Sequence, residues 1–235
     1  MKLSIIIPTY NEAGTIREII DYIQSVNYPI PYEIIIIDDA SIDRTYEKEL
    51  LIRLKNESAR SNIRVFKNRI NRGKGFSIRK GIKRATGDII IIQDADTEYD
   101  PKEIPKLLTP ILNGEAKVVY GSRFLNTPRP EGMVYLALIA NKFLTKLTNI
   151  LFGLSLTDME TCYKVFRARI IKNLPLRSNR FTFEPEVTAL IARKGIGIKE
   201  LPISYRGRSF KEGKKIGAKD FVLAVLVLFW HWIKR

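Results

Sequence analysis

Residues 87 to 98 read GDIIIIQDADTE, and this stretch decides the expected fold. Its apolar, β-branched run lacks the polar alternation of a half-exposed strand, which is typical of a strand covered on both faces. Three carboxylates, Asp94, Asp96 and Glu98, follow directly. Holding three like charges together calls for a positive charge nearby, although a solvated acidic turn is the simpler alternative.

Similar runs recur along the first half of the chain, at 3–8, 32–38, 62–66 and 116–121. Between these runs, the isoleucines from Ile16 to Ile23 recur at the spacing of one helix face. The segments ASIDRT (40–45) and DPKEIPKLL (100–108) contain residues that commonly begin helices. Strands alternating with helices predict an α/β fold, with a mostly parallel central sheet flanked by helices.

The second half of the chain has a different pattern, with long apolar helical stretches at 134–152 and 217–234. We expect one catalytic domain over 1–216 and an amphipathic C-terminal helix over 217–235. The longest apolar stretch, 221–233, falls short of the roughly 20 residues that a bilayer span needs. The aromatic and basic residues at the C-terminal end of this stretch are typical of a helix that lies at a membrane interface. A helix packed on the protein core explains the stretch equally well.

The composition indicates a polyanionic partner. The 235 residues contain 40 Lys and Arg against 25 Asp and Glu, a formal net charge of +15. Nucleic acid, an anionic membrane face and phosphorylated substrates all fit this charge. The single cysteine, Cys162, and single histidine, His231, exclude an internal disulfide and Cys- or His-based zinc sites, so a metal would need oxygen ligands. No leader pattern is present at the N-terminus, and we expect a cytoplasmic protein.

Polar motifs follow the expected strands: PTYNE (8–12), DDAS (38–41), DADTE (94–98) and GSR (121–123). In open α/β sheets, ligands bind beyond the carboxyl ends of the strands, so these motifs should meet at one site. No Walker loop or dinucleotide fingerprint occurs. Asp94 and Asp96 lie on the same side of an extended backbone, and two hard oxygen ligands suit Mg²⁺ or Mn²⁺.

These motifs, with IIIPTYNE, IIIIDDASID, GKGFSIRKGI, TGDIIIIQDADTEYDP, YGSRF and ELPISYRGRSFKEGKKI in this order, resemble the family 2 glycosyltransferases. The resemblance is greatest to the dolichyl-phosphate mannose synthase branch and its polyprenyl-phosphate glucosyl relatives. It implies a GT-A nucleotide-sugar-binding fold, a GDP- or UDP-sugar donor, a divalent cation and inversion at the anomeric carbon.

The resemblance also implies residue roles. The nucleotide-sugar site would consist of Pro8, Tyr10, Glu12, Ile37, Asp39, Asp94, Ala95 and Asp96. The metal would be held by Asp94, Asp96 and Glu98. Acceptor phosphate would be bound by Arg123, Arg208 and Lys214, and the catalytic residues would be Asp96, Arg123 and Arg208. Helix capping is the alternative role for Asp39, and Lys74 is expected near the donor phosphates.

The acceptor determines which further groups catalysis requires. A phosphate is already anionic near pH 7 and can attack C1 without a base, whereas a saccharide or protein hydroxyl must lose a proton. Asp158 is the candidate base for that alternative. We therefore expect a metal-dependent inverting enzyme that moves mannose or glucose to a dolichyl or polyprenyl phosphate, peripheral at the cytoplasmic face of an anionic membrane. A nucleic-acid-binding module explains the basic charge but not the strand-end acids, so we expect no nucleic acid partner.

Overall fold

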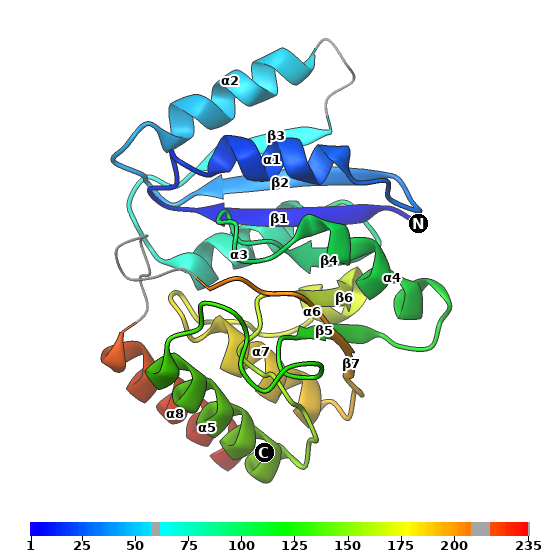
Figure 1. Ribbon diagram of the computed structural model, residues 1–235, viewed down its shortest axis with the longest axis vertical. Coiled ribbons are helices and arrows are strands. Elements are labelled where there is room, and N and C mark those ends of the chain that lie inside the picture. Colours follow the sequence, from blue (N-terminus) through cyan, green and yellow to red (C-terminus); the bar gives the residue numbers. More distant parts are fainter. Residues whose placement is uncertain (58–61, 208–216, 235) are drawn as a thin grey trace.

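The computed structural model describes residues 1–57, 62–207 and 217–234 (Figure 1). Within them the chain forms a seven-stranded sheet in the order β3-β2-β1-β4-β6-β5-β7. The strands are β1 (Leu3–Thr9), β2 (Tyr32–Asp38), β3 (Ile63–Lys67), β4 (Ile89–Ile92), β5 (Val118–Ser122), β6 (Lys164–Arg167) and β7 (Lys199–Pro202). All five predicted strands are present.

Most neighbouring strands run parallel, as the sequence predicts. The pairs β1–β2, β2–β3, β1–β4 and β5–β7 are parallel. β6 is the exception, because it pairs antiparallel with both β4 and β5. β6 therefore joins the first four strands to the second half of the chain in one continuous sheet.

The helices in chain order are α1 (Ile16–Ser25), α2 (Thr45–Glu57), α3 (Lys74–Arg84), the 3₁₀ turn η1 (Pro101–Glu103), α4 (Ile104–Leu112), α5 (Tyr135–Phe152), α6 (Ala168–Lys172), α7 (Phe183–Arg193) and α8 (Ala218–Ile233). One face of the sheet is covered by α1, α2 and α4, and the other by α3 and α6 (Figure 1). Helices on both faces explain why the central strands are apolar throughout.

The core is built largely from isoleucine. Each of the runs Ile5–Ile7, Ile34–Ile37 and Ile89–Ile92 is buried almost completely, since the sheet is covered on both sides. Burying one such side chain is worth about 1.5–3 kcal/mol relative to leaving it in water. The resulting rigid sheet edge positions the loops that follow β1, β2 and β4.

The helices α5 and α8 lie side by side at one end of the molecule (Figure 1). α8 is docked on the body of the protein, with Ala224 and Leu228 buried against its neighbours. Both helices also present large apolar side chains to solvent, among them Leu136 (75% exposed) and Trp230 (54% exposed). Within the part of the chain that the structure describes, no helix has both the length and the apolar character that crossing a bilayer requires.

Candidate active site

A cavity of about 750 Å³ opens at the carboxyl ends of β1, β2 and β4 and continues between α5 and α8. It brings together nine residues that the sequence assigns to the site: Pro8, Tyr10, Glu12, Asp39, Asp94, Ala95, Asp96, Glu98 and Arg123. Ile37 is different, because its side chain is fully buried in β2 and does not line the cavity. Arg208 and Lys214 lie outside the described residues.

The walls of the cavity change character along its length. The strand-end half carries the acids and Lys74, whereas the far half is lined by apolar side chains of α5 and α8, including Ile139, Phe143 and Phe221. Arg123 and Tyr205 are also part of the wall. A single cavity thus offers a polar compartment and an apolar one.

Lys74, at the start of α3, supplies the positive charge that the acidic motif requires. Its ammonium nitrogen lies 2.8 Å from Oδ1 of Asp94 and 3.3 Å from Oε1 of Glu184 on α7. Burial lowers the pKa of Lys74, but the nearby charges, chiefly Asp94, outweigh burial and hold that pKa well above its ordinary value. Asp94 is therefore paired with a cation that belongs to the protein itself.

Two glycines flanking Lys74 allow the chain to place it there. Gly73 has φ +97, and a Cβ at this position would lie 2.4 Å from the carbonyl oxygen of Asn179. A Cβ on Gly75 would lie 2.7 Å from the carbonyl oxygen of Ser178. Only glycine fits such close backbone approaches, and only glycine adopts the first conformation at little cost. The sequence signal for this arrangement is the RGKG motif at the start of a helix.

Asp39 holds the same loop from the other side. Its carboxylate accepts hydrogen bonds from Nδ2 of Asn68 (2.7 Å) and from the backbone N–H groups of Arg72 and Gly73 (2.6 Å for the latter). Asp39 lines the cavity as well, so its position is compatible with the expected contact to base or ribose. In the structure it anchors the loop that carries Lys74, rather than capping a helix.

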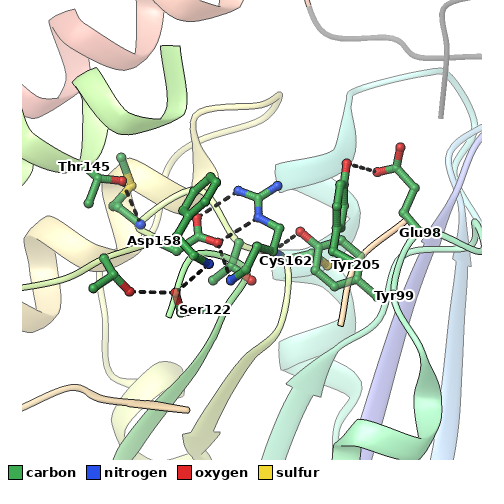
Figure 2. Close-up of polar contacts among 12 residues, drawn as sticks. Glu98, Tyr99, Ser122, Thr145, Asp158, Cys162 and Tyr205 are labelled. Carbon is green, nitrogen blue, oxygen red and sulfur yellow. Dashed lines mark hydrogen bonds and ion pairs between the residues drawn. The ribbon is translucent and has the colours of Figure 1, made fainter. Parts of the chain in front are cut away.

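The metal-binding motif is only partly assembled. Oδ1 of Asp96 accepts a hydrogen bond from the backbone N–H of Glu98. The Tyr205 hydroxyl donates one to Oε2 of Glu98 (Figure 2). Among the described residues, no group of three acids, histidines or cysteines is arranged to hold a metal ion. Asp94 and Asp96 nonetheless suit Mg²⁺ or Mn²⁺ as a donor set, because such ions commonly take one or two carboxylates and fill other positions with water and substrate phosphate.

Arg123 and Asp158 form a buried ion pair. Nε and Nη2 of Arg123 donate to the two carboxylate oxygens of Asp158, at 2.7 and 2.8 Å, and the backbone N–H of Arg123 adds a third bond. Asp158 is fully buried and Arg123 is 6% exposed. Burial lowers the pKa of Arg123, but Asp158 more than compensates and holds it well above its ordinary value. The sequence places both residues at the acceptor side but does not reveal that they pair.

A comparison with known families identifies the family of the chain. The model of the family described as glycosyl transferase family 2 matches residues 4–174. The chain belongs to glycosyl transferase family 2. The resemblance that the motifs indicate is thereby confirmed, and the expected α/β fold of the GT-A type, with its C-terminal helix, is confirmed with it.

Curated relatives of this family 2 glycosyltransferase include enzymes named for lipid-phosphate acceptors. A dolichol-phosphate mannosyltransferase of Pyrococcus furiosus is 29% identical over 222 residues, which cover 92% of this chain and 61% of that protein. The chain thus spans less than two thirds of that relative. A UDP-N-acetylglucosamine–dolichyl-phosphate N-acetylglucosaminyltransferase of Methanococcus voltae is 30% identical over 234 residues, covering 92% of each.

Solved structures share the fold. The glucosyl-3-phosphoglycerate synthase of Mycobacterium tuberculosis, crystallised with Mn²⁺, UDP and phosphoglyceric acid, superposes with a TM-score of 0.70 at 18% identity. The superposition covers 98% of this family 2 chain and 78% of the synthase. At this identity the likeness establishes the fold alone.

Proposed function

We propose that this family 2 glycosyltransferase moves a hexose, mannose or glucose, from a GDP- or UDP-sugar to a dolichyl or polyprenyl phosphate, with inversion at the anomeric carbon. The observation that carries the proposal is the single cavity with one polar and one apolar compartment. A nucleotide sugar suits the first compartment and an isoprenoid chain suits the second. The phosphate of the acceptor would then lie where the two compartments meet.

The donor would lie against the strand-end motifs. Pro8, Tyr10, Glu12 and Asp39 line the part of the cavity that we assign to the nucleoside. Asp94 and Asp96 would hold Mg²⁺ or Mn²⁺, and a divalent cation bound there would neutralise charge on the departing diphosphate. Lys74 adds a positive charge beside Asp94, which favours binding of the donor's diphosphate.

The acceptor phosphate would be bound by Arg123, with Arg208 and Lys214 as further proposed contacts. The two side-chain bonds from Arg123 to Asp158 use Nε and Nη2, so among the residues that the structure describes its Nη1 donors are left for a ligand. In the proposed reaction, a phosphate oxygen attacks C1 of the sugar on the face opposite the diphosphate. The C1–O bond to the diphosphate breaks, and the diphosphate leaves with the bonding electron pair.

The environment of Asp158 supports a phosphate acceptor over a hydroxyl acceptor. A general base must lie within reach of the proton that it removes, and both oxygens of Asp158 already accept bonds from Arg123 in a fully buried position. Protonating Asp158 would also remove the partner of a buried guanidinium. A phosphate nucleophile avoids both costs, because it has no proton to surrender.

We also propose that α5 and α8 lie at the cytoplasmic face of an anionic membrane. Exposed apolar side chains on the two helices would enter the lipid interface, and the basic net charge of the chain would add attraction to anionic headgroups. Two weak signals of this kind together hold a protein at a bilayer. Binding to anionic vesicles that weakens with salt, measured by flotation, would support this part of the proposal.

The function is tested by transfer of label into lipid. The protein is incubated with Mg²⁺ or Mn²⁺, a polyprenyl phosphate and, in turn, labelled GDP-mannose, UDP-glucose and UDP-N-acetylglucosamine, and the lipid is then extracted. We expect label from a hexose donor in the organic phase, in an acid-labile product. Label found only in water-soluble glycan or protein would overturn the lipid-phosphate acceptor.

A further inference from the structure

A carboxyl group in the cavity wall takes no part in the arrangement described so far. Glu160 lies between Asp158 and β6 and lines the cavity. Its Oε1 atom is buried, and within the described part of the chain it has no hydrogen-bond partner. A buried polar atom without a partner costs free energy, so such atoms commonly mark a place where a ligand completes the hydrogen bonding.

The charges around Glu160 come from several elements. Glu184 is on α7, Lys164 is the first residue of β6, and Arg123 follows β5. Burial and then the charge of Glu184 raise the pKa of Glu160, so its carboxyl holds a proton more readily than an exposed glutamate does. A carboxyl of this kind both donates and accepts hydrogen bonds.

Lys164 does not satisfy this carboxyl through a hydrogen bond. Its ammonium group is fully buried and donates to the backbone carbonyl oxygens of Met159 and Thr161, the residues on either side of Glu160. These bonds fix the backbone of the segment and hold Glu160 in the wall. The backbone at Glu160 is thus held in place, while the Oε1 atom of its side chain is left for another partner.

The ligand group that fits is a sugar hydroxyl. Lys74, which pairs with Asp94 beside the proposed diphosphate site, also pairs with Glu184, and Glu184 is the neighbour whose charge acts on Glu160. The transferred sugar is the part of the donor next to the diphosphate, and its hydroxyls pair well with carboxyl oxygens. Resting on the function proposed above, we infer that Glu160 hydrogen-bonds a hydroxyl of the transferred sugar and orients that sugar for attack.

A structural role, in which Glu160 serves only to balance the buried charge of Lys164, makes different predictions. Such a role would change stability and leave the recognition of sugar untouched. The discriminating quantity is therefore the gain in affinity that the sugar adds, which is the affinity of the nucleotide sugar relative to that of the bare nucleoside diphosphate.

The test measures this gain by calorimetry for wild type, Glu160→Ala and Glu160→Gln. The ligands are the donor that wild type transfers, chosen among GDP-mannose, UDP-glucose and UDP-N-acetylglucosamine, and the matching GDP or UDP. Glu115→Gln, on an exposed loop, is the matched surface control. Thermal unfolding of each variant checks that it is folded, and transfer rates are measured in parallel.

We expect Glu160→Ala to bind the bare nucleoside diphosphate as wild type does. The affinity gain that the sugar adds should fall by about 10-fold in this variant, and its transfer rate by about 10²-fold. Glu160→Gln should stay within a few-fold of wild type, because an amide also donates and accepts. An unchanged gain in Glu160→Ala, with wild type active, would overturn this inference alone. A wild type that neither binds nor transfers any nucleotide sugar would instead overturn the proposed function.

Discussion

The two compartments of the cavity are prepared for ligands in opposite ways. In the polar compartment, Asp39 and Asp94 are already held by groups of the protein, the loop amides in one case and Lys74 in the other. In the apolar compartment, α5 exposes side chains such as Ile139 (47%) and Phe143 (50%). A donor must therefore exchange partners with existing hydrogen bonds and an existing ion pair, whereas a lipid chain would gain by covering surface that is already exposed to water.

We therefore expect the polar compartment to provide specificity and the apolar compartment to provide affinity. When a ligand replaces the partners of Asp39 and Asp94, the free-energy cost is small if its groups have matching charge and hydrogen-bonding character. The cost is large if they do not, so the polar compartment selects its ligand. Covering exposed apolar surface is favourable for any chain of suitable width. We expect mutations in the polar compartment to act on single steps, and those in the apolar compartment to depend on the length of the acceptor.

The largest expected effect tests whether the acceptor-side ion pair is structural as well as functional. Arg123→Ala leaves the buried carboxylate of Asp158 without its partner, which should lower the free energy of unfolding by about 3–5 kcal/mol. Lys199→Ala removes an ion pair of similar length, to Glu115, on the surface, and should cost no more than about 1 kcal/mol. Urea unfolding at pH 7 measures both. Equal losses in the two variants would show that burial of the Arg123 pair has no energetic consequence.

The next effect concerns the polar compartment. Asp96→Asn preserves an oxygen that can accept the bond from the Glu98 backbone but removes the negative charge, so the turn should survive. We expect transfer to fall by about 10²–10³-fold, the range typical for loss of one charge-stabilising group. EDTA should do the same to wild type, and Mg²⁺ or Mn²⁺ should restore activity. Full turnover of wild type in EDTA would refute a divalent cation at Asp94 and Asp96.

A smaller, pH-dependent effect concerns Glu49 of α2, which lies behind the polar compartment and accepts a hydrogen bond from Thr9. Burial, and more weakly the charge of Asp38, raise the pKa of Glu49 to about 8. The unfolded chain loses this proton near the ordinary glutamate pKa, so the folded state binds it more tightly, and stability falls as the pH rises from about 5 to 8.

Glu49→Gln removes this titration. The stability of the variant relative to wild type should therefore increase between pH 5 and pH 8.5, by on the order of 4 kcal/mol, in urea unfolding experiments. Glu33→Gln is the control, because hydrogen bonds from Ser4, Thr86 and Lys2 outweigh burial and lower the pKa of Glu33 to about 2. Its effect should be constant over the same range. A pH-independent difference for Glu49→Gln would mean that Glu49 is ionised in the folded protein.

The sequence predicts the first half of the molecule well, for physical reasons. Long runs such as Ile34–Ile37 have few stable environments other than the centre of a covered parallel sheet, and the polar residues after them must then share one edge. The sequence does not predict β6, because its four residues, Lys164–Arg167, begin with a lysine that is fully buried, which a strand pattern does not indicate. It does not predict β7 or α7 either.

Pairings between distant residues account for most of what the sequence did not reveal about the site. Arg123 and Asp158 are 35 positions apart, and each alone suits a role toward a ligand. Lys74 was expected near the phosphates, but its contact with Glu184 depends on the packing of α7. Ile37 is assigned to the nucleotide site by the resemblance alone, yet it lies within β2 and is buried in the core, whereas Asp39 lies just beyond the end of that strand and lines the cavity.

Blocking the apolar compartment shows whether a lipid chain occupies the same cavity as the donor. Ala140 of α5 lines the cavity, and Ala140→Phe should fill part of it, whereas Ile150→Phe adds a ring on the exposed side of the same helix. Transfer rates are compared with undecaprenyl phosphate and with the short geranyl phosphate. We expect Ala140→Phe to lower transfer to the long acceptor by about 10-fold or more, while transfer to the short acceptor and donor affinity stay near wild type. Equal rates for both acceptors in Ala140→Phe and wild type would contradict this expectation.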